Sequence, residues 1–300
     1  MDVTEARAVV ALNNRFYEEN AASFSATRGA PWHGWSRCLK VARAELGLGA
    51  GASAGEKRAA AGMAERPSSV RVLDVACGNL RFEAFLAHEL PDVACDCCAV
   101  DSCVALAGAG EGADAAEGAG ARVPAVRFRE LDVLACLADA AEGAAKDAGA
   151  DELARTLADR FGMPPCDLTV CFGFMHHVPV PAWRAAVVRA LALSVRPGGI
   201  VCVSFWRFLD DERLARKAQE ATEQAQGDHA LARLVRAFGP GDRLLGWQDR
   251  AGSFRYCHGF SDGEVTDLAA SVADRARPIA RFRADGKSGQ LNEYLVLRVL

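Results

Sequence analysis

The chain has 300 residues, an apolar fraction of 51% and a formal net charge of −4, so it can bury a sizeable core and its charge gives no support to nucleic-acid binding. No stretch approaches the roughly 18 apolar residues that cross a bilayer. The charged amino terminus is not followed by an apolar run, so we expect neither a membrane span nor a secretory signal. Eleven cysteines, an odd number without two C-x-x-C motifs, favour a reduced protein in the cytoplasm.

The amino-terminal region is predicted to be helical. Apolar residues recur at helical spacing over residues 5–20, a polar and aromatic loop follows at 23–32, and a second helix covers 35–46. We therefore expect residues 1–47 to form a helical lid. The small residues of 48–67 are typical of a flexible linker.

The segment 72–83 carries the clearest motif. An apolar strand reaches Asp74, a tight turn contains Gly78, and an amphipathic helix follows, as in the first β-turn-α unit of a doubly wound nucleotide-binding sheet. Ala76 and Leu80 stand where the dinucleotide fingerprint G-x-G-x-x-G would place two further glycines. Because those glycines let the backbone approach a pyrophosphate, their loss argues against NAD or ATP and favours a ligand without phosphates.

A second strand is predicted at 93–101. It ends in Asp101, 23 residues after Gly78, where an acidic side chain typically accepts both ribose hydroxyls of a bound ligand. Residues 104–122 show no clear pattern, and a third strand follows at 125–129.

Four cysteines raise the question of a zinc site: Cys95, Cys97, Cys98 and Cys103. Cys97 and Cys98 are neighbours on the predicted second strand, so their side chains point to opposite faces. We therefore predict no metal site.

Strands and helices continue to alternate after the third strand. An alanine-rich helical stretch is predicted at 135–161, a fourth strand at 167–172, a helix at 181–195, an Arg-Pro-Gly-Gly turn at 196–199 and a fifth strand at 200–205. Alternation of this kind predicts a parallel sheet with right-handed crossovers.

The pattern changes beyond the fifth strand. A substrate-side excursion is expected over about 207–260, with a charged helix at 210–226 and short extended pieces around Leu244 and Phe254. Ser261 and Glu264 then form a capping box at the start of another helix.

The end of the chain is predicted to return to the sheet. Residues 279–282 and 294–299 look like a closing antiparallel pair. We therefore expect residues 68–300 to form one domain.

Four features in this order resemble the class I S-adenosylmethionine (SAM) methyltransferases: the Asp74/Gly78 turn, Asp101, Asp132, and the fourth strand followed by Arg-Pro-Gly-Gly. The resemblance covers about residues 68–206 and the terminal strands. It implies an α/β fold with a Rossmann-like, doubly wound, mostly parallel seven-stranded sheet and an antiparallel carboxyl-terminal strand. It also implies SAM as the cofactor.

The resemblance further implies which residues contact SAM. The turn at 76–79 would lie against the methionine part, Asp101 would hold the ribose, and Asp132 would border the adenine. Each of these acids, like Asp74, has a plainer alternative as a turn-capping or solvated loop acid. The implied cofactor residues are Arg28, Asp74, Ala76, Cys77, Gly78, Asn79, Asp101, Ser102, Asp132, Val133, Phe172 and Gly173.

A closer resemblance lies outside that core. Phe16 to Trp32, Met175 to His177, Gly241 to Trp247 and Arg255 to Glu264 are similar, in that order, to signatures of the eukaryotic tRNA wobble-uridine carboxymethyl methyltransferases. This resemblance implies a tRNA substrate, esterification of its carboxymethyl group and a small activating partner subunit. Cys257 departs from the pattern, which has an aromatic residue there.

Two arginines are the leading candidates for binding carboxylates. A guanidinium can fix a carboxylate through two parallel hydrogen bonds. One of Arg28 and Arg255 is therefore expected to hold the methionine carboxylate of SAM and the other the substrate, and which does which stays open. An ordinary salt bridge is the alternative for either arginine.

Histidine and aromatic side chains complete the predicted catalytic group. His176 and His177 are expected to contact substrate or carry a proton, with a structural hydrogen bond to backbone as the alternative. His258 has the same two interpretations. Tyr256, like Trp32 and Trp206, is a candidate for stacking on a flipped-out base or for core packing.

Three functions remain open on the sequence. The first is a SAM-dependent methyltransferase that acts on a modified tRNA uridine. The second is a methyltransferase for a small metabolite with a carboxylate, amine or hydroxyl group, which the near-neutral charge favours. The third is a non-catalytic subunit that keeps the fold, which the loss of two glycines suggests.

Overall fold

The computed structural model describes residues 1–48, 67–110, 125–143, 149–248, 250 and 252–300. Most of the predicted linker at 48–67 and most of the unpatterned stretch at 104–122 lie outside these residues. None of the helices within the described ranges is both long and apolar enough to cross a membrane.

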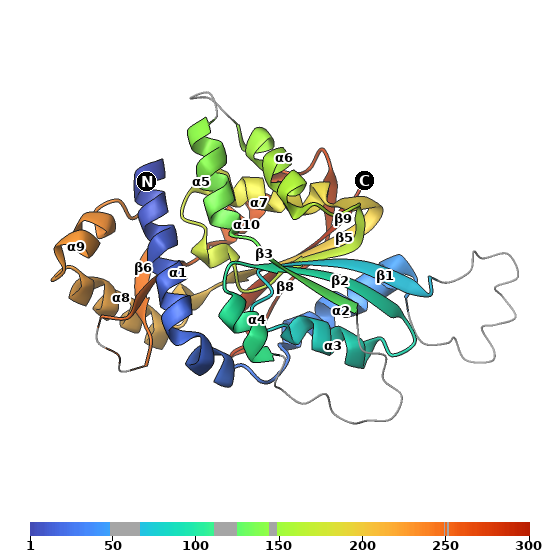
Figure 1. The fold of residues 1–300 in the computed structure, drawn as a ribbon, viewed down its shortest axis with the longest axis horizontal. Coiled ribbons are helices and arrows are strands. Elements are labelled where there is room, and N and C mark those ends of the chain that lie inside the picture. The colour runs from blue at the N-terminus through green and yellow to red at the C-terminus, as the bar shows by residue number, and fades with distance from the viewer. Residues whose placement is uncertain (49–66, 111–124, 144–148, 249, 251) are drawn as a thin grey trace, which may run out of the picture.

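A seven-stranded sheet with the order β3-β2-β1-β4-β5-β9-β8 forms the centre of the molecule (Figure 1). Its neighbouring pairs from β3 to β5 are parallel, and β9 runs antiparallel to both β5 and β8. This confirms the predicted mostly parallel sheet with an antiparallel carboxyl-terminal strand. The strands are β1 (Ser69–Val75), β2 (Ala94–Asp101), β3 (Ala125–Glu130), β4 (Cys166–Cys171), β5 (Val195–Trp206), β8 (Ala276–Ala284) and β9 (Asn292–Val299).

Helices cover both faces of this sheet (Figure 1). α5, α6, α7 and α10 contribute to the hydrophobic cluster on one face, and α2 and α3 to the cluster on the other. The helices are α1 (Val3–Ala26), α2 (His33–Leu46), α3 (Arg81–Glu89), α4 (Val104–Gly110), α5 (Val133–Gly143), α6 (Ala150–Phe161), α7 (Pro181–Leu193), α8 (Glu212–Ala225), α9 (His229–Val235) and α10 (Asp262–Ala270).

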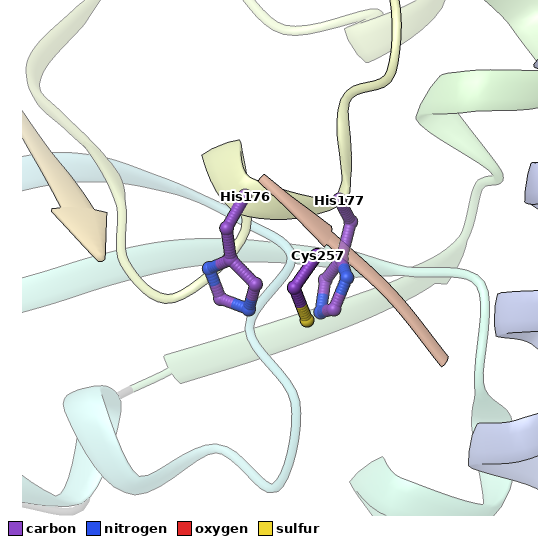
Figure 2. A group of neighbouring side chains, drawn as sticks. All are labelled: His176, His177 and Cys257. Carbon is purple, nitrogen blue, oxygen red and sulfur yellow. The ribbon is translucent and has the colours of Figure 1, made fainter. Parts of the chain in front are cut away.

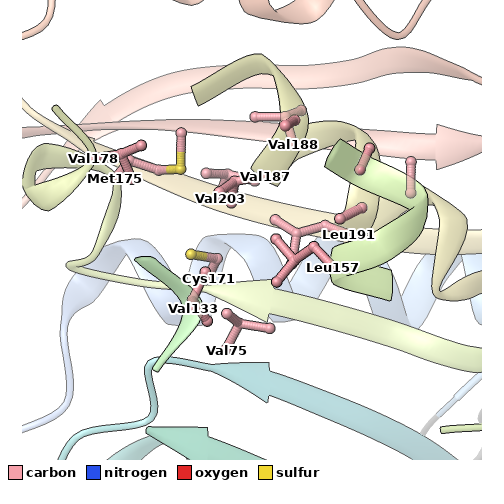
Figure 3. Close-up of a cluster of buried hydrophobic side chains, with 14 of the residues drawn as sticks. Val75, Val133, Leu157, Cys171, Met175, Val178, Val187, Val188, Leu191 and Val203 are labelled. Carbon is pink, nitrogen blue, oxygen red and sulfur yellow. The ribbon is translucent and has the colours of Figure 1, made fainter. Parts of the chain in front are cut away.

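Strand alternation divides the core into these two clusters. In β1, Val75 belongs to the cluster with α5 to α7 and Val72 to the cluster with α2 and α3, as a two-residue period requires. Figure 3 shows Val75 near Leu157 of α6 and Leu191 of α7 in the first cluster. The neighbours Cys97 and Cys98 also fall into different clusters, which confirms that they point to opposite faces.

Helix α1 is longer than predicted and includes the first residues of the expected loop. It continues to Ala26 because Phe24 packs edge-to-face on Tyr17, with ring centroids 5.0 Å apart. Contacts between aromatic side chains on the same face of a helix, one to two turns apart, stabilise that helix. The helical spacing over 5–20 therefore extends through residues that look like a loop by composition.

Two predicted boundaries were wrong. The Arg-Pro-Gly-Gly segment lies inside β5, where Val195 already pairs with Cys166 and a register shift precedes the pairing of Ile200 with Leu168. Gly198, with φ +80°, lies in the left-handed region within this irregular stretch. The alanine-rich stretch at 135–161 contains two helices, α5 and α6, and residues 144–148 between them lie outside the described ranges.

The excursion after β5 builds a small layer beside α1. It contains the short helix Phe208–Asp210, then α8 and α9, and the antiparallel hairpin of β6 (Asp242–Gly246) and β7 (Phe254–His258). The side-chain amide of Asn13 in α1 forms hydrogen bonds with the backbone at the edge of this hairpin. Its Oδ1 accepts the N–H of Tyr256 at 2.7 Å and its Nδ2 donates to the carbonyl of Tyr256 at 3.3 Å. The hairpin and α1 therefore hold each other in place (Figure 1).

Candidate active site

A cavity of about 570 Å³ lies at the carboxyl ends of the parallel strands, the usual ligand position in open α/β sheets. α1 and the β6–β7 hairpin contribute to its walls, together with residues of α2, α3, α4 and the segment between β8 and β9. Its lining includes Arg28, Asp74, Ala76, Cys77, Gly78, Asn79, Asp101, Ser102, Asp132, Val133, Phe172, Gly173, His176, His177 and Arg255. The structure thus brings together every residue predicted to contact the cofactor, and three of the five predicted catalytic residues.

Asp101 connects the first two strands at the cavity wall. One of its carboxylate oxygens accepts the backbone N–H of Gly78 at 2.9 Å, and the other accepts that of Cys103 at 2.8 Å. A carboxylate has about four lone-pair sites, so both oxygens keep the capacity to accept further donors. Asp101 therefore presents free acceptor sites at the cavity wall.

The turn after β1 keeps the backbone of a glycine-rich loop even though two glycines are replaced. Ala76 has φ +62° and Leu80 has φ +59°, and Gly78 between them has φ +58°. Residues with a Cβ adopt this left-handed region at a cost of about 1–2 kcal/mol each. Since the surrounding fold enforces the conformation, the missing glycines have not changed the path of the turn.

We expect Ala76→Gly to stabilise the protein by about 0.5–1 kcal/mol, because the relief of the left-handed strain exceeds the added freedom of the unfolded chain. Urea denaturation of the two proteins measures this difference. Ala84→Gly is the matched control, because Ala84 is exposed inside α3 and the same substitution there should cost about 1 kcal/mol. Equal destabilisation by both substitutions would contradict strain at Ala76.

Asp132 has a structural role at the opposite side of the cavity. It precedes α5, and its carboxylate accepts the N–H of Ala135 at 2.8 Å and the side-chain amide of Asn14 at 2.7 Å. It is therefore an N-cap that also fixes α1 to the sheet. It lies in the cavity lining beside Val133, where the adenine border was predicted, and each of its oxygens keeps one further acceptor site, as in Asp101.

The two histidines lie on the short helix Met175–His177 that follows β4 (Figure 2). His177 contacts the hydroxyl of Tyr17 through Nε2 at 2.8 Å and the carbonyl of Tyr256 through Nδ1 at 3.1 Å. This is the structural, backbone-bonded role. The His176 ring lies against the His177 ring at an interplanar angle of 54°, with centroids 4.0 Å apart, and its buried Nδ1 has no partner in the described part of the chain.

Both imidazoles are neutral at physiological pH. Burial, followed by the charge of Arg255, lowers the pKa of His177 to about 3. Burial lowers the pKa of His176 far below its usual range, and the neighbouring His177 and Arg255 add to this effect. His176 is the one of the two with a nitrogen free to form a hydrogen bond. Because its imidazole is neutral, that ring can accept a hydrogen bond from a ligand.

Cys257 completes a cluster with these histidines, and one ligand-type atom from each residue lies within 4.8 Å of the others (Figure 2). The donors are poorly arranged for a metal cation. Both nitrogens of His177 already have partners, and the guanidinium of Arg255 contacts the Cys257 side chain. A cation there would have to break those hydrogen bonds and lie against a positive charge.

Arg255 and Arg28 line the cavity, and the guanidinium group of each packs against aromatic rings. The Arg255 guanidinium carbon lies 4.9 Å from the Phe16 centroid and 5.6 Å from that of Trp247, while Arg28 lies 3.4 Å from the Phe24 centroid. Arg255 is only 5% exposed, and its buried Nε and Nη1 have no hydrogen-bond partner among the described residues. Burial lowers the pKa of Arg28 to about 10.

Neither arginine has an acidic partner among the residues that the structure describes. The ion pairs of the described residues involve neither Arg28 nor Arg255, so the predicted alternative of an ordinary salt bridge does not apply within them. Cation–π contacts compensate a buried guanidinium only in part. Two guanidinium groups at one cavity, neither of them in an ion pair of the described residues, favour a ligand that carries a carboxylate or another anionic group.

Tyr256 and His258 do not line the cavity. Side chains alternate along β7, so Arg255 and Cys257 face the histidines whereas Tyr256 and His258 face away. There, Asp242 accepts hydrogen bonds from the Tyr256 hydroxyl and from His258 Nδ1 at 2.7 Å. Arg184 and Glu264 complete this buried network. Both residues therefore anchor the hairpin to α7 and α10 and do not reach the cavity.

Of the three residues predicted to stack on a base, Trp32 and Trp206 lie at the cavity and Tyr256 is buried away from it. Trp32 lines the cavity and packs so closely on Gly173 that a Cβ at that glycine would lie 3.0 Å from the indole. Trp206 also lines the cavity, with its ring 5.0 Å from His176. Tyr17, Phe24 and Trp247 also line the cavity. They lie in the segments 16–32 and 241–247, but the sequence alone did not indicate that they belong to the site.

The sequence matches no protein-family model and no curated protein. Among solved structures, the chain is similar to a SAM-dependent methyltransferase from Methanosarcina mazei, with a TM-score of 0.51 and 12% identity over 78% of this chain and 93% of that chain. A SAM-dependent methyltransferase from Clostridium acetobutylicum gives 0.49 and 10% over 95% and 98%. Magnesium protoporphyrin IX methyltransferase from Synechocystis with bound SAH gives 0.49 and 11% over 98% and 99%. By strand order and this likeness, the chain has the fold of the class I SAM-dependent methyltransferases.

Proposed function

We propose that the protein is a SAM-dependent methyltransferase whose methyl acceptor is a carboxylate. The observation that carries the proposal is the buried, unpaired guanidinium of Arg255 at a cavity that also contains Asp101. A protein that only kept the fold as a structural subunit would gain stability by losing this charge. Its retention supports a ligand that pairs with it.

The residues of the cavity fit SAM. Asp101 offers a carboxylate for the ribose hydroxyls, the turn at 76–79 suits a part of the ligand that carries no phosphate, and Val133 offers an apolar border for a base. Either Arg28 or Arg255 is suited to the methionine carboxylate. SAM, when bound, supplies a methyl group activated by its sulfonium.

The acceptor chemistry makes few demands on the protein. A carboxylate is already ionised near neutral pH, so no strong base has to remove a proton before attack. The remaining arginine fixes the carboxylate through two parallel hydrogen bonds, and His176, neutral and with a free nitrogen, contacts the acceptor from the strand side. Alignment for in-line attack can contribute several kcal/mol to the rate.

Within this class, we propose the carboxymethyl group of a tRNA wobble uridine as the acceptor. The supporting features are the motifs at 16–32, 175–177, 241–247 and 255–264, together with Trp32 and Trp206 on the cavity wall, where a flipped base would stack. The same resemblance supports a small activating partner subunit. A small carboxylate metabolite is the competing acceptor, and the net charge of −4 favours it.

The experiment uses purified protein and SAM labelled in the methyl group. We expect SAM and S-adenosylhomocysteine to raise the melting temperature, and label to enter bulk tRNA and to leave it on mild alkaline treatment, because a methyl ester is hydrolysed where N- and C-methyl groups are not. Label that resists alkali would contradict a carboxylate acceptor. Alkali-labile label that appears only with small carboxylates would contradict the tRNA acceptor, and no response to either ligand would overturn the proposal as a whole.

A further inference from the structure

A second carboxyl group is buried next to Asp74, the acid at the end of β1. Glu83, in the first turn of α3, and Asp74 are each only 2% exposed, and each carboxyl group shifts the pKa of the other. Within the described residues no donor group satisfies either oxygen of Glu83. Because two neighbouring carboxyl groups buried without a donor cannot both carry a negative charge, one of them holds a proton.

No positive charge of the described residues is paired with the two acids in place of that proton. The titratable groups that face the pair are the thiols of Cys77, Cys97 and Cys171 and the carboxylate of Asp101. Neither acid of the pair forms an ion pair with a described arginine, lysine or histidine. Only the amino-terminal end of α3 favours a negative charge at Glu83.

Of the two acids, Asp74 is the one that lines the cavity, beside the turn at 76–78. We propose that Asp74 and Glu83 share a proton in the free protein and release it to solvent when the ammonium group of SAM binds beside Asp74. One cation enters and one proton leaves, so the charge of the buried site is conserved. Glu83 thereby acts as a positioning residue that makes cofactor binding depend on pH. This inference rests on the proposed binding of SAM.

The pKa values of the pair agree with this geometry. Burial raises the pKa of Glu83 to about 7, and burial together with the Glu83 carboxyl raises the pKa of Asp74 far above its usual range. The pair therefore keeps a proton at neutral pH. Since a bound cation favours the doubly ionised form, SAM affinity must rise with pH, by at most about tenfold per pH unit while one proton is released.

The test is titration calorimetry of SAM binding at pH 7 in two buffers with different ionisation enthalpies. For the wild-type protein we expect a net release of protons and an affinity that rises about tenfold from pH 6 to pH 8. In Glu83→Gln the amide donates to Asp74, which stays ionised. This variant should therefore release fewer protons, bind SAM more tightly than wild type at pH 6, and melt at a higher temperature at pH 8.

Two controls isolate the pair. Asp92→Asn removes an exposed carboxyl just beyond α3 and should leave proton release unchanged. 5′-Methylthioadenosine lacks the ammonium group, so the wild-type protein should bind it without releasing a proton, a measurement that needs no variant to fold. The amino group of SAM itself titrates equally with every protein, so the difference between wild type and Glu83→Gln reports on the pair alone.

The failures of the two proposals are distinguishable. SAM binding with equal proton release in wild type and Glu83→Gln, or equal release with SAM and methylthioadenosine, overturns the shared-proton site and leaves the methyltransferase proposal intact. No SAM binding by the wild-type protein overturns the proposed function itself.

Discussion

Arg255→Met is expected to slow methyl transfer strongly and at the same time to make the protein more stable. The guanidinium is 5% exposed and lacks an anionic partner among the described residues, so its burial costs several kcal/mol that cation–π contacts recover only in part. Methionine fills a similar volume without the charge. We expect the free energy of unfolding to rise by about 1–3 kcal/mol.

Activity should change in the opposite direction. Losing a charged, two-pronged hydrogen bond to the acceptor or to the cofactor carboxylate removes about 3–4 kcal/mol, so kcat/KM should fall by about 10²- to 10³-fold. Urea denaturation and methyl transfer to the accepted substrate measure the two effects on the same samples. Arg255→Lys, which keeps the charge but not the fork, should lose most of the activity without the gain in stability.

Arg243→Met is the matched control for this pair of measurements. Arg243 lies opposite Cys257 on the partner strand β6, and its guanidinium donates to the carbonyls of Pro240 and Asp242 outside the cavity lining. We expect unchanged kcat/KM in this variant. If Arg255→Met loses stability and keeps its activity, Arg255 is part of the scaffold and the carboxylate proposal is wrong.

Asp101→Ala is expected to weaken SAM binding by about 100-fold or more. Each hydrogen bond from a ribose hydroxyl to an ionised carboxylate contributes about 1.5–3 kcal/mol, and the substitution removes two of them. It also leaves the N–H groups of Gly78 and Cys103 without their acceptor, which loosens the turn that faces the methionine part. Calorimetric titration of SAM measures the loss, and Asp101→Asn should be intermediate because one oxygen remains.

Glu130→Gln controls for the removal of a negative charge near this edge. Glu130 pairs with Asp101 across β2 and β3 but is exposed and absent from the cavity lining, so SAM affinity should not change. Melting curves without ligand show whether Asp101→Ala is folded. A folded Asp101→Ala protein with wild-type affinity would contradict the ribose assignment.

Residues close together in sequence determined much of the fold and the cofactor half of the site. Short apolar segments bounded by turn residues predicted the strands, and a parallel sheet necessarily brings the carboxyl ends of β1, β2 and β4 to one edge. The turn at 76–79, Asp101 and Asp132 therefore meet at one cavity, whatever the remaining contacts. The capping box at Ser261 was likewise correct because its two hydrogen bonds are local.

The substrate half depended on contacts between distant segments. Alternation shows that Arg255 and Tyr256 point to opposite sides of β7, but not which side faces the cavity, because Asp242 and Asn13 fix that choice. The lack of an ion-pair partner for Arg255 likewise became visible only in three dimensions.

The amino-acid sequence by itself determined the succession of strands and helices along the chain and the acids at the strand ends, because local periodicity and turn chemistry specify them. Only the tertiary structure decided which charges are buried without partners, such as Arg255 and Glu83. The physical reason is that burial and ion pairing are sums over neighbours from many parts of the chain, and spacing along the sequence does not contain them.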